Sequence, residues 1–287
     1  MNKMVLKAPA KLNLILQVLS ERKNGYHKIR GVNCSLDLAD TIILTKQPKK
    51  IEIICSSKEV PKEHKNLSYQ VAKKLKKMVG RADLGARIEI IKNIPVRAGL
   101  GGGSSDAAAT LKGLSRLWKL NLKTKQLNII AQKIGMDVCF CLVGGVCQIS
   151  GTGEKVKKLN LKLPKIPIVI VSPKASKPST AWAYKNLDLF PGDRDTRRTE
   201  KLIKAIKAKD IQGMAENLEN DFEPLMDKSY PIIRKIREEM IKYGASRAML
   251  AGSGLAVFGL FKNKNIAEDA HLKLKNKYQK AYLTKAR

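Results

Sequence analysis

Apolar and polar residues follow two different periods along the first half of the chain, and these periods predict strands and helices in alternation. Residues 4–19 alternate and then become continuously apolar, which is typical of one or two strands. Over 66–79 an apolar residue recurs every three or four positions with lysines between, as in an amphipathic helix. A second helix is expected over 124–134, ended by Gly135. Further strands are predicted at 34–38, 41–44, 51–55 and 86–91.

The second half of the chain has the order strand, helices, β-hairpin, helix, strand, which is typical of an α+β sandwich. A short strand is predicted over 168–171 and a loop over 174–184. A tight turn at Gly252-Ser253-Gly254 joins two strand-like runs, 248–251 and 255–261, into a hairpin. Helices are predicted at 199–208, 210–217, 230–242 and 267–277.

A chain of 287 residues is long enough for two domains. The polar, basic stretch 151–165 separates the two halves, and we place the boundary there, giving domains 1–158 and 159–287. No apolar run reaches the roughly 18 residues that a membrane helix needs. The five cysteines form no C-x-x-C pair, which indicates buried free thiols and not a disulfide framework or a metal site. We therefore expect a cytoplasmic protein.

The chain carries a formal net charge of +31, so it is expected to attract polyanions. Its lysines are dispersed along the sequence and are not interleaved with aromatic residues, which make up 5% of the chain. This pattern favours a solvated lysine surface over a nucleic-acid interface. High lysine usage is also compatible with growth at high temperature.

A glycine-rich loop that passes into a helix is the strongest local signal: residues 95–109 read P-V-R-A-G-L-G-G-G-S-S-D-A-A-A. Ser104 or Ser105 is the expected N-cap, with Asp106 in the first turn. Unpaired backbone N–H groups converge at such a helix start and bind phosphate. No lysine follows the glycines, so this is no Walker A loop, and Ser104 interrupts G-x-G-x-x-G. The alternative is a flexible linker before an ordinary helix.

Three further groups of polar residues are candidates for a site. Lys11 and Asn13 share one face of the first strand, so they line either a pocket or a solvated edge. An N-G turn presents Tyr26 and His27 together, either to hold a planar ligand or simply as a surface loop. Asp137 begins an apolar run between two glycine signals, and is either a helix N-cap or a functional carboxylate.

Together these motifs resemble the GHMP kinase superfamily, and within it the family of 4-diphosphocytidyl-2-C-methyl-D-erythritol kinases. The resemblance runs nearly end to end. It rests on A-P-A-K-L-N-L at 8–14, N-G-Y-H at 24–27, N-I-P-V-R-A-G-L-G-G-G-S-S-D-A-A-A at 93–109, G-M-D-V-C-F-C-L-V-G-G at 135–145, N-D-F-E at 220–223 and A-G-S-G-L-A-V-F at 251–258. It implies an α+β fold of two domains, an N-terminal ribosomal-protein-like α/β domain and a C-terminal ferredoxin-like α+β domain.

The resemblance also implies a reaction, in which ATP with Mg²⁺ phosphorylates the 2-hydroxyl of 4-diphosphocytidyl-2-C-methylerythritol in the non-mevalonate isoprenoid pathway. Asp137 matches the catalytic acid–base residue and Lys11 the lysine beside it. The residues that match the ATP site are Pro95, Gly99, Leu100, Gly101, Gly102, Gly103, Ser104, Ser105 and Asn66. Those that match the acceptor site, or close its cytidine side, are Asn13, Tyr26, His27, Lys92, Asp137, Thr180 and Tyr184. Ser105 is the expected protein contact for Mg²⁺.

Two departures from the family pattern and two rival functions accompany this interpretation. Ala251 stands where the family usually has serine, and V-C-F-C follows Met136-Asp137 where V-P-F-F is commoner in the family. One rival is another small-molecule kinase of the superfamily. The other is a nucleic-acid-binding protein, suggested by the charge. We expect small-molecule substrates, no specific nucleic acid, no membrane, and a monomer or homodimer.

Overall fold

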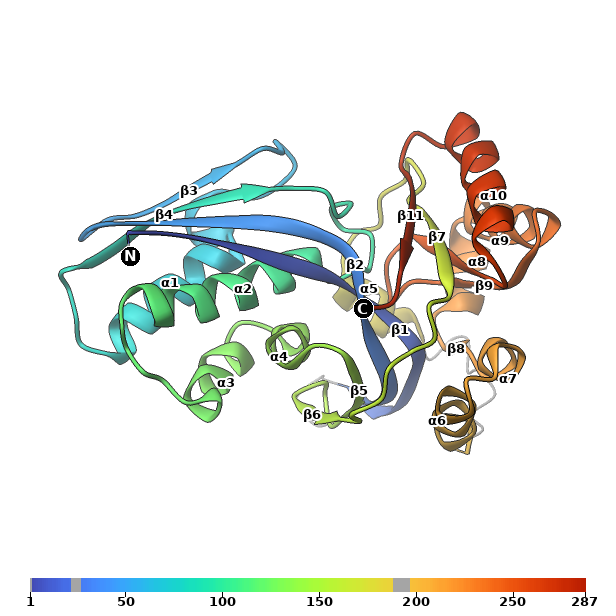
Figure 1. Cartoon of the computed structure of the whole chain (residues 1–287), viewed down its shortest axis with the longest axis horizontal. Coiled ribbons are helices and arrows are strands. Elements are labelled where there is room, and N and C mark those ends of the chain that lie inside the picture. Colours follow the sequence, from blue (N-terminus) through green and yellow to red (C-terminus); the bar gives the residue numbers. More distant parts are fainter. Residues whose placement is uncertain (1, 22–26, 188–196) are drawn as a thin grey trace.

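The first half of the chain is built on a long hairpin of two strands (Figure 1). The computed structural model describes residues 2–21, 27–187 and 197–287. Strand β1 (Lys3–Glu21) pairs antiparallel with β2 (His27–Pro48) along almost its whole length. The central sheet has the order β3-β4-β2-β1-β8, and two further strands, β5 and β6, extend from β2. Its remaining strands are β3 (Ile51–Cys55), β4 (Leu84–Ile91), β5 (Val146–Ser150), β6 (Lys155–Lys158) and β8 (Glu219–Asn220).

Strand β1 is one continuous strand because its apolar side chains are buried in successive clusters along its length. Ala8 belongs to the core under the first-half helices, Leu12 to a second core, and Val18 to the core of the C-terminal half. The register with β2 shifts three times, between Pro9 and Lys11, between Asn13 and Ile15, and near the end of the strand. Such bulges re-aim side chains locally. Lys11 and Asn13 lie between the first two of them.

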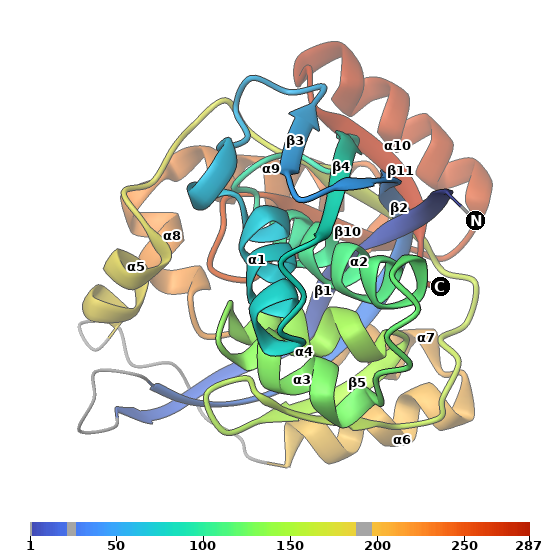
Figure 2. The same cartoon turned by 90° about the vertical axis from the view of Figure 1, so that its left-hand side faces the viewer.

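Four helices cover one face of the first sheet: α1 (Leu67–Met78), α2 (Gly102–Leu117), α3 (Thr124–Gln132) and α4 (Met136–Val143) (Figures 1 and 2). Asn66 is the N-cap of α1, and its side-chain oxygen accepts a hydrogen bond from the backbone N–H of Ser68. The expected serine cap of the glycine-rich segment was wrong. Helix α2 begins at Gly102, and Gly101 caps it in the left-handed conformation, at φ +65°.

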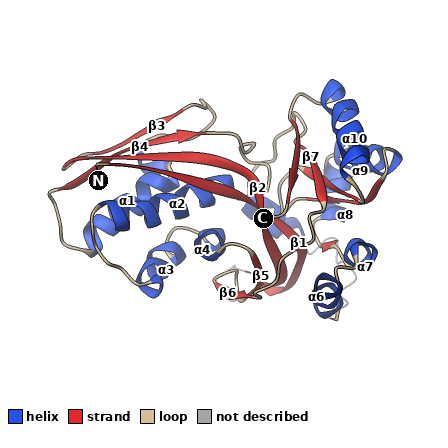
Figure 3. Ribbon diagram, in the orientation of Figure 1, coloured by secondary structure: helices blue, strands red, loops and turns tan. Residues whose placement is uncertain are grey.

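The second half contains a four-stranded sheet of order β11-β7-β10-β9 with helices packed on it (Figure 3). Its strands are β7 (Pro167–Val171), β9 (Ala245–Leu250), β10 (Val257–Phe261) and β11 (Ala281–Lys285). The helices are α5 (Thr180–Leu187), α6 (Arg198–Ala208), α7 (Ile211–Glu216), α8 (Glu223–Ser229), α9 (Pro231–Lys242) and α10 (Lys264–Lys277). The loop predicted over 174–184 is wrong from Thr180 onward, because Ser179 Oγ accepts from Trp182 N–H at the start of α5.

The N-D-F-E motif at 220–223 fastens the two halves together. Asn220 donates its amide to the carbonyls of Leu250 and Gly252, at 2.9 and 2.8 Å. The carboxylate of Asp221 accepts from the backbone N–H of Val18, at 2.7 Å. Strand β8, which contains Asn220, also pairs in parallel with β1. A strand of the second half therefore belongs to the sheet of the first half, so the sheets alone do not divide the chain at 158/159. The boundary there stays a prediction.

Candidate active site

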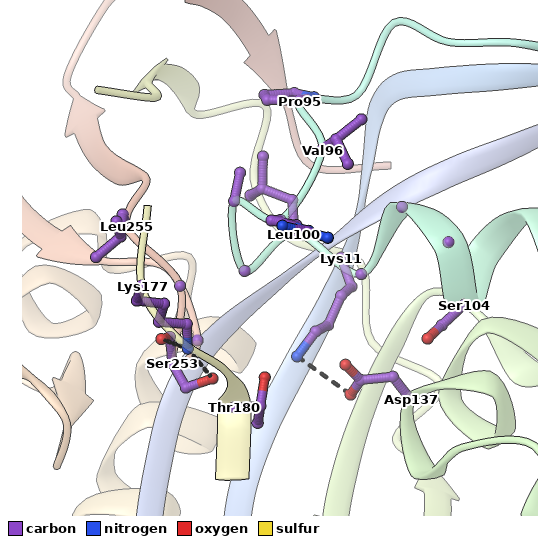
Figure 4. Close-up of a pocket in the computed structure, with 18 of the residues that line it drawn as sticks. Lys11, Pro95, Val96, Leu100, Ser104, Asp137, Lys177, Thr180, Ser253 and Leu255 are labelled. Atoms are coloured by element: carbon purple, nitrogen blue, oxygen red, sulfur yellow. Dashed lines mark hydrogen bonds and ion pairs between the residues drawn. The ribbon is translucent and has the colours of Figure 1, made fainter. Parts of the chain in front are cut away.

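A cavity of about 2300 Å³ lies where β1, the glycine-rich loop, the first turn of α4 and the segments 172–180 and 252–255 meet (Figure 4). Most of the predicted site residues line it. They are Lys11, Asn13, His27, Asn66, Lys92, Pro95, Gly99, Leu100, Gly101, Gly102, Gly103, Ser104, Asp137, Thr180 and Tyr184. Ser105 does not line this cavity. Tyr26 lies outside the described residues.

The glycine-rich loop is held between the 251–254 turn on one side and Lys11 on the other. Gly99 has φ +85°, and a Cβ there would lie 1.9 Å from the carbonyl oxygen of Ala251. Gly101 has φ +65°, and a Cβ there would lie 2.6 Å from Cγ of Lys11. The backbone N–H of Lys11 donates to the carbonyl of Leu100 at 2.9 Å. This packing requires glycine at both positions and turns the first residues of α2 toward the cavity.

The start of α2 supplies the cavity with a phosphate-binding geometry. Gly102, Gly103 and Ser104 form its first turn and line the cavity. The backbone N–H groups of a first helical turn have no partner within the helix, and the helix dipole adds partial positive charge there. An anion is therefore stabilised at this point of the cavity. The linker alternative for this segment is excluded, because the glycines are fixed by packing.

Lys11 and Asp137 form an ion pair that faces the cavity. Lys11 Nζ lies 3.2 Å from Asp137 Oδ1, and the side chains are 7% and 45% exposed. Asp137 stands in the first turn of α4, whose N-cap is Gly135, so the N-cap interpretation of Asp137 was wrong. Lys11 Nζ also donates to Asn13 Oδ1 at 3.0 Å, and Asn13 donates to Asn33 Oδ1 at 2.7 Å. The buried ammonium is thereby fixed, while the carboxylate keeps an open side.

Lys92 borders the cavity, but its ammonium is paired beneath the glycine-rich loop. Lys92 Nζ donates to the carboxylates of Asp40 and Asp106, the latter at 2.9 Å, and the side chain is 6% exposed. Burial lowers the pKa of Lys92, but the two carboxylates outweigh that effect and raise it above its ordinary value. Burial raises the pKa of Asp106; Lys92 opposes this rise and Asp40 adds to it. The two acids take two of the three donors of the Lys92 ammonium, so its expected substrate contact stays a prediction.

Asp40 was not among the predicted site residues, although its carboxylate binds the backbone just before the glycine-rich loop. Its Oδ1 accepts from the backbone N–H groups of Asn93 and Ile94, at 2.6 and 2.9 Å. Its side chain is fully buried. A carboxylate between the apolar runs 34–38 and 41–44 is the sequence signal that could have identified it. Asp40, Lys92 and Asp106 together connect β2, the end of β4 and α2.

The Mg²⁺ contact expected of Ser105 does not fit the structure. The Ser105 hydroxyl donates to the carbonyl of Pro9 at 2.7 Å, and the residue is 2% exposed. Because α2 begins at Gly102, Ser105 faces the interior and the preceding residue, Ser104, faces the cavity. Ser104 is drawn beside Asp137 in Figure 4. The hydroxyl and the carboxylate are hard oxygen groups of the kind that Mg²⁺ prefers.

An aromatic wall closes another side of the cavity. The rings of His27 and Tyr184 are 5.2 Å apart and tilted by 31°. Tyr184 in turn meets Phe222 edge-on, at 5.0 Å and 88°. Burial raises the pKa of Tyr184, so its hydroxyl stays protonated at neutral pH. Thr180 begins α5 on the same side, so β2, α5 and the N-D-F-E motif combine in one wall.

The Asn66 amide is occupied by the backbone. Its oxygen accepts from Ser68 N–H at 2.8 Å, and its nitrogen donates to the carbonyl of Pro61 at 2.9 Å. Asn66 thus borders the cavity as the residue that fixes the start of α1.

Within the described parts of the chain no group of three or more His, Cys, Asp or Glu side chains could hold a metal ion. In those same parts no helix is both long and apolar enough to cross a membrane.

Comparison with known proteins gives one family. Residues 66–145 match the GHMP kinases N terminal domain, and residues 202–280 match GHMP kinases C terminal. A relative named 4-diphosphocytidyl-2-C-methyl-D-erythritol kinase, from Acetivibrio thermocellus, is 39% identical over 285 residues, covering 99% of each chain. One of the same name from Caldicellulosiruptor bescii is 43% identical over 273 residues, covering 95% of this chain and 94% of the relative.

Solved structures agree with these relatives. A crystal structure of 4-(cytidine 5'-diphospho)-2C-methyl-D-erythritol kinase matches with a TM-score of 0.81 and 30% identity, covering 99% of each chain. Homoserine kinase from Cytophaga hutchinsonii matches with a TM-score of 0.76 and 17% identity, covering 100% of this chain and 95% of the other, and so shares the fold. The predicted two-domain α+β kinase fold is confirmed. The chain therefore belongs to the 4-diphosphocytidyl-2-C-methyl-D-erythritol kinase family of the ATP-dependent GHMP kinases.

Proposed function

We propose that this protein transfers the γ-phosphoryl group of ATP to the 2-hydroxyl of 4-diphosphocytidyl-2-C-methylerythritol, a step of the non-mevalonate isoprenoid pathway. The observation that supports it is the convergence of three parts on one cavity. These are the helix start at Gly102, the Lys11–Asp137 pair, and the His27–Tyr184 wall. The helix start suits phosphate, the Asp137 carboxylate suits a hydroxyl that gives up its proton, and the aromatic wall suits a flat pyrimidine base.

In the proposed reaction Asp137 accepts the proton of the 2-hydroxyl as its oxygen attacks the γ-phosphorus. The new O–P bond forms while the bond to the β-phosphate oxygen breaks, and ADP leaves. A tertiary alcohol is a weak acid, so an aligned carboxylate is useful, and such acid–base catalysis contributes roughly 10²- to 10⁴-fold. Lys11, 3.2 Å away, holds that carboxylate in position and offsets negative charge on the transferred group.

The first turn of α2 is proposed to hold the ATP phosphates by its backbone N–H groups. Mg²⁺, when bound with ATP, neutralises charge on the β- and γ-phosphates. We propose Ser104 and Asp137 as the protein groups nearest to it, in place of Ser105. Mg²⁺ normally takes one or two protein oxygens together with phosphate oxygens and water, which suits a site with this few protein ligands.

On the acceptor side, Tyr26 and His27 are proposed to bind the cytosine base, with Tyr184 and Thr180 closing the wall. The His27 and Tyr184 rings, 5.2 Å apart, form an aromatic surface that suits a planar base. Asn13 is proposed to act through Lys11, since its oxygen holds that ammonium at 3.0 Å. Asn66 is proposed to border the adenine base.

The direct test is a coupled ADP assay with the purified protein, ATP, Mg²⁺ and the diphosphocytidyl acceptor, with the product identified by ³¹P NMR. We expect turnover that requires the acceptor and a new phosphomonoester on it. Folded protein that makes no such product refutes the proposal. His27→Ala separates this acceptor from other alcohols: it should raise the acceptor KM, whereas the exposed His64, outside the cavity, provides a matched control as His64→Ala.

A further inference from the structure

Lys177 is a cation of the cavity wall that the proposed reaction leaves without a task. It lies in the segment between β7 and α5 and lines the cavity. Its Nζ donates to the backbone carbonyl of Ser253 and to Ser253 Oγ, the latter at 3.0 Å. Figure 4 shows it beside Ser253, across the cavity from the Lys11–Asp137 pair. The ammonium is thus anchored on the glycine turn at 252–254.

The charge of Lys177 has no counterion within residues 2–21, 27–187 and 197–287. Among the described residues, no carboxylate forms an ion pair with Lys177. By contrast, Lys11 pairs with Asp137, and Lys92 pairs with two carboxylates. Burial of the side chain lowers the pKa of Lys177 to about 8. The ammonium is therefore mostly protonated at neutral pH. A half-buried positive charge that only neutral oxygens contact is costly unless an anion completes its shell.

The position of the turn brings this charge close to the phosphate loop. Gly254 packs directly on the glycine-rich loop, since a Cβ there would lie 2.3 Å from the backbone nitrogen of Gly99. Ala256 N–H also donates to the carbonyl of Ala98, at 3.2 Å. Two of the three ammonium donors are directed to Ser253, which leaves one donor for a ligand.

We propose that Lys177 binds a phosphate oxygen of a nucleotide substrate, and that Ser253 positions its ammonium for this contact. The proposal rests on the proposed kinase reaction, which places two phosphate-bearing nucleotides in this cavity. The shared chemistry is a phosphate oxygen, and its two possible sources are the diphosphate of the cytidine substrate and the phosphates of ATP. The structural alternative is a lysine that only tethers segment 172–180 to the turn.

The test compares nucleotides with their nucleosides by isothermal titration calorimetry at pH 7. CDP, cytidine, ATP and adenosine are titrated into the wild-type protein, Lys177→Met and Lys177→Arg. Lys235→Met removes an exposed lysine outside the cavity and controls for the lost charge. We expect Lys177→Met to weaken CDP or ATP by at least about tenfold, the scale of a charged hydrogen bond, and to leave the nucleosides unchanged. Lys177→Arg should restore part of the loss.

Each outcome of the titrations either supports the phosphate contact of Lys177 or overturns it. A loss confined to CDP assigns the contact to the acceptor diphosphate, and a loss confined to ATP assigns it to ATP. Unchanged binding of both nucleotides by Lys177→Met overturns the proposal. Equal losses for nucleotides and nucleosides overturn it as well, in favour of the structural tether. Failure of the proposed function appears elsewhere, as wild-type protein that does not turn over the diphosphocytidyl acceptor, and nucleotide binding still tests Lys177 in that case.

Discussion

Gly101→Ala tests whether the loop and Lys11 depend on each other. Gly101 caps α2 at φ +65°, and an added Cβ would lie 2.6 Å from Cγ of Lys11. Ordinary contact begins at 3.4 Å, and 3.4 − 2.6 = 0.8 Å, so the buried Lys11 stem must move by about that much. Its Nζ then leaves the 3.2 Å position beside Asp137.

Two effects of this substitution can be separated in magnitude. A side chain in the left-handed conformation costs roughly 1–2 kcal/mol of stability. For a protein of this size that corresponds to a Tm lower by about 2 to 8 °C. A misplacement of about 1 Å in a catalytic constellation costs on the order of 100-fold in rate. We therefore expect modest destabilisation and a kcat lower by about two orders of magnitude.

Gly80→Ala is the matched control, because Gly80 also has φ +65° but a Cβ there meets nothing within 4 Å. Gly101→Ala should lose at least as much stability as Gly80→Ala in a thermal melt, and only Gly101→Ala should lose turnover in the coupled ADP assay. A kcat of Gly101→Ala equal to that of Gly80→Ala would show that the added Cβ does not displace Lys11. A rise in the KM for ATP at normal kcat would equally contradict the displacement of Lys11.

Ser105, Lys92 and Lys177 can each be tested by one substitution or pH series. Ser105→Ala should lower stability by about 1 kcal/mol through the lost hydrogen bond to the strand, while kinetic titration with Mg²⁺ shows an unchanged requirement. Lys92→Met should destabilise by about 3–5 kcal/mol in urea melts, because two buried acids lose their cation. That loss should shrink as pH falls, since protonation of Asp106 removes charge; a loss that grows at low pH would contradict the assignment. Because deprotonation of Lys177 near pH 8 removes its charge, the KM of its phosphate ligand should rise above that pH in wild type, and a flat KM profile to pH 9 would count against the contact.

Sequence periodicity was sufficient for elements whose cores are local. The helix predicted over 66–79 is α1, and the strand over 86–91 is part of β4. The start of α2 was misplaced because we expected a side-chain cap, whereas the chain uses a left-handed glycine that packing against Lys11 demands. A cap of that kind depends on a partner 90 residues away and has no local signal.

In the candidate site, too, residues within sequence motifs could be predicted, whereas contacts between distant residues could not. Residues carried by motifs, such as Lys11, Asp137 and His27, do converge on one cavity. The pairing of Lys92 could not be predicted, because its two acids lie 52 and 14 residues away in sequence and meet it only in the folded sheet. The role of N-D-F-E was equally hidden, since Asn220 and Asp221 bind backbone atoms of β1, β9 and the glycine turn, which are distant in sequence.

The proposed reaction depends above all on Asp137, which accepts the proton of the acceptor hydroxyl. The most direct test of this role is the kcat of Asp137→Asn with the diphosphocytidyl acceptor, alongside ATP affinity measured by calorimetry without Mg²⁺. Asp83→Asn, an exposed carboxylate outside the cavity, is the control. The proposed mechanism predicts a kcat lower by about 10²- to 10⁴-fold with ATP affinity within about twofold of wild type. A kcat of Asp137→Asn equal to that of the control would contradict it.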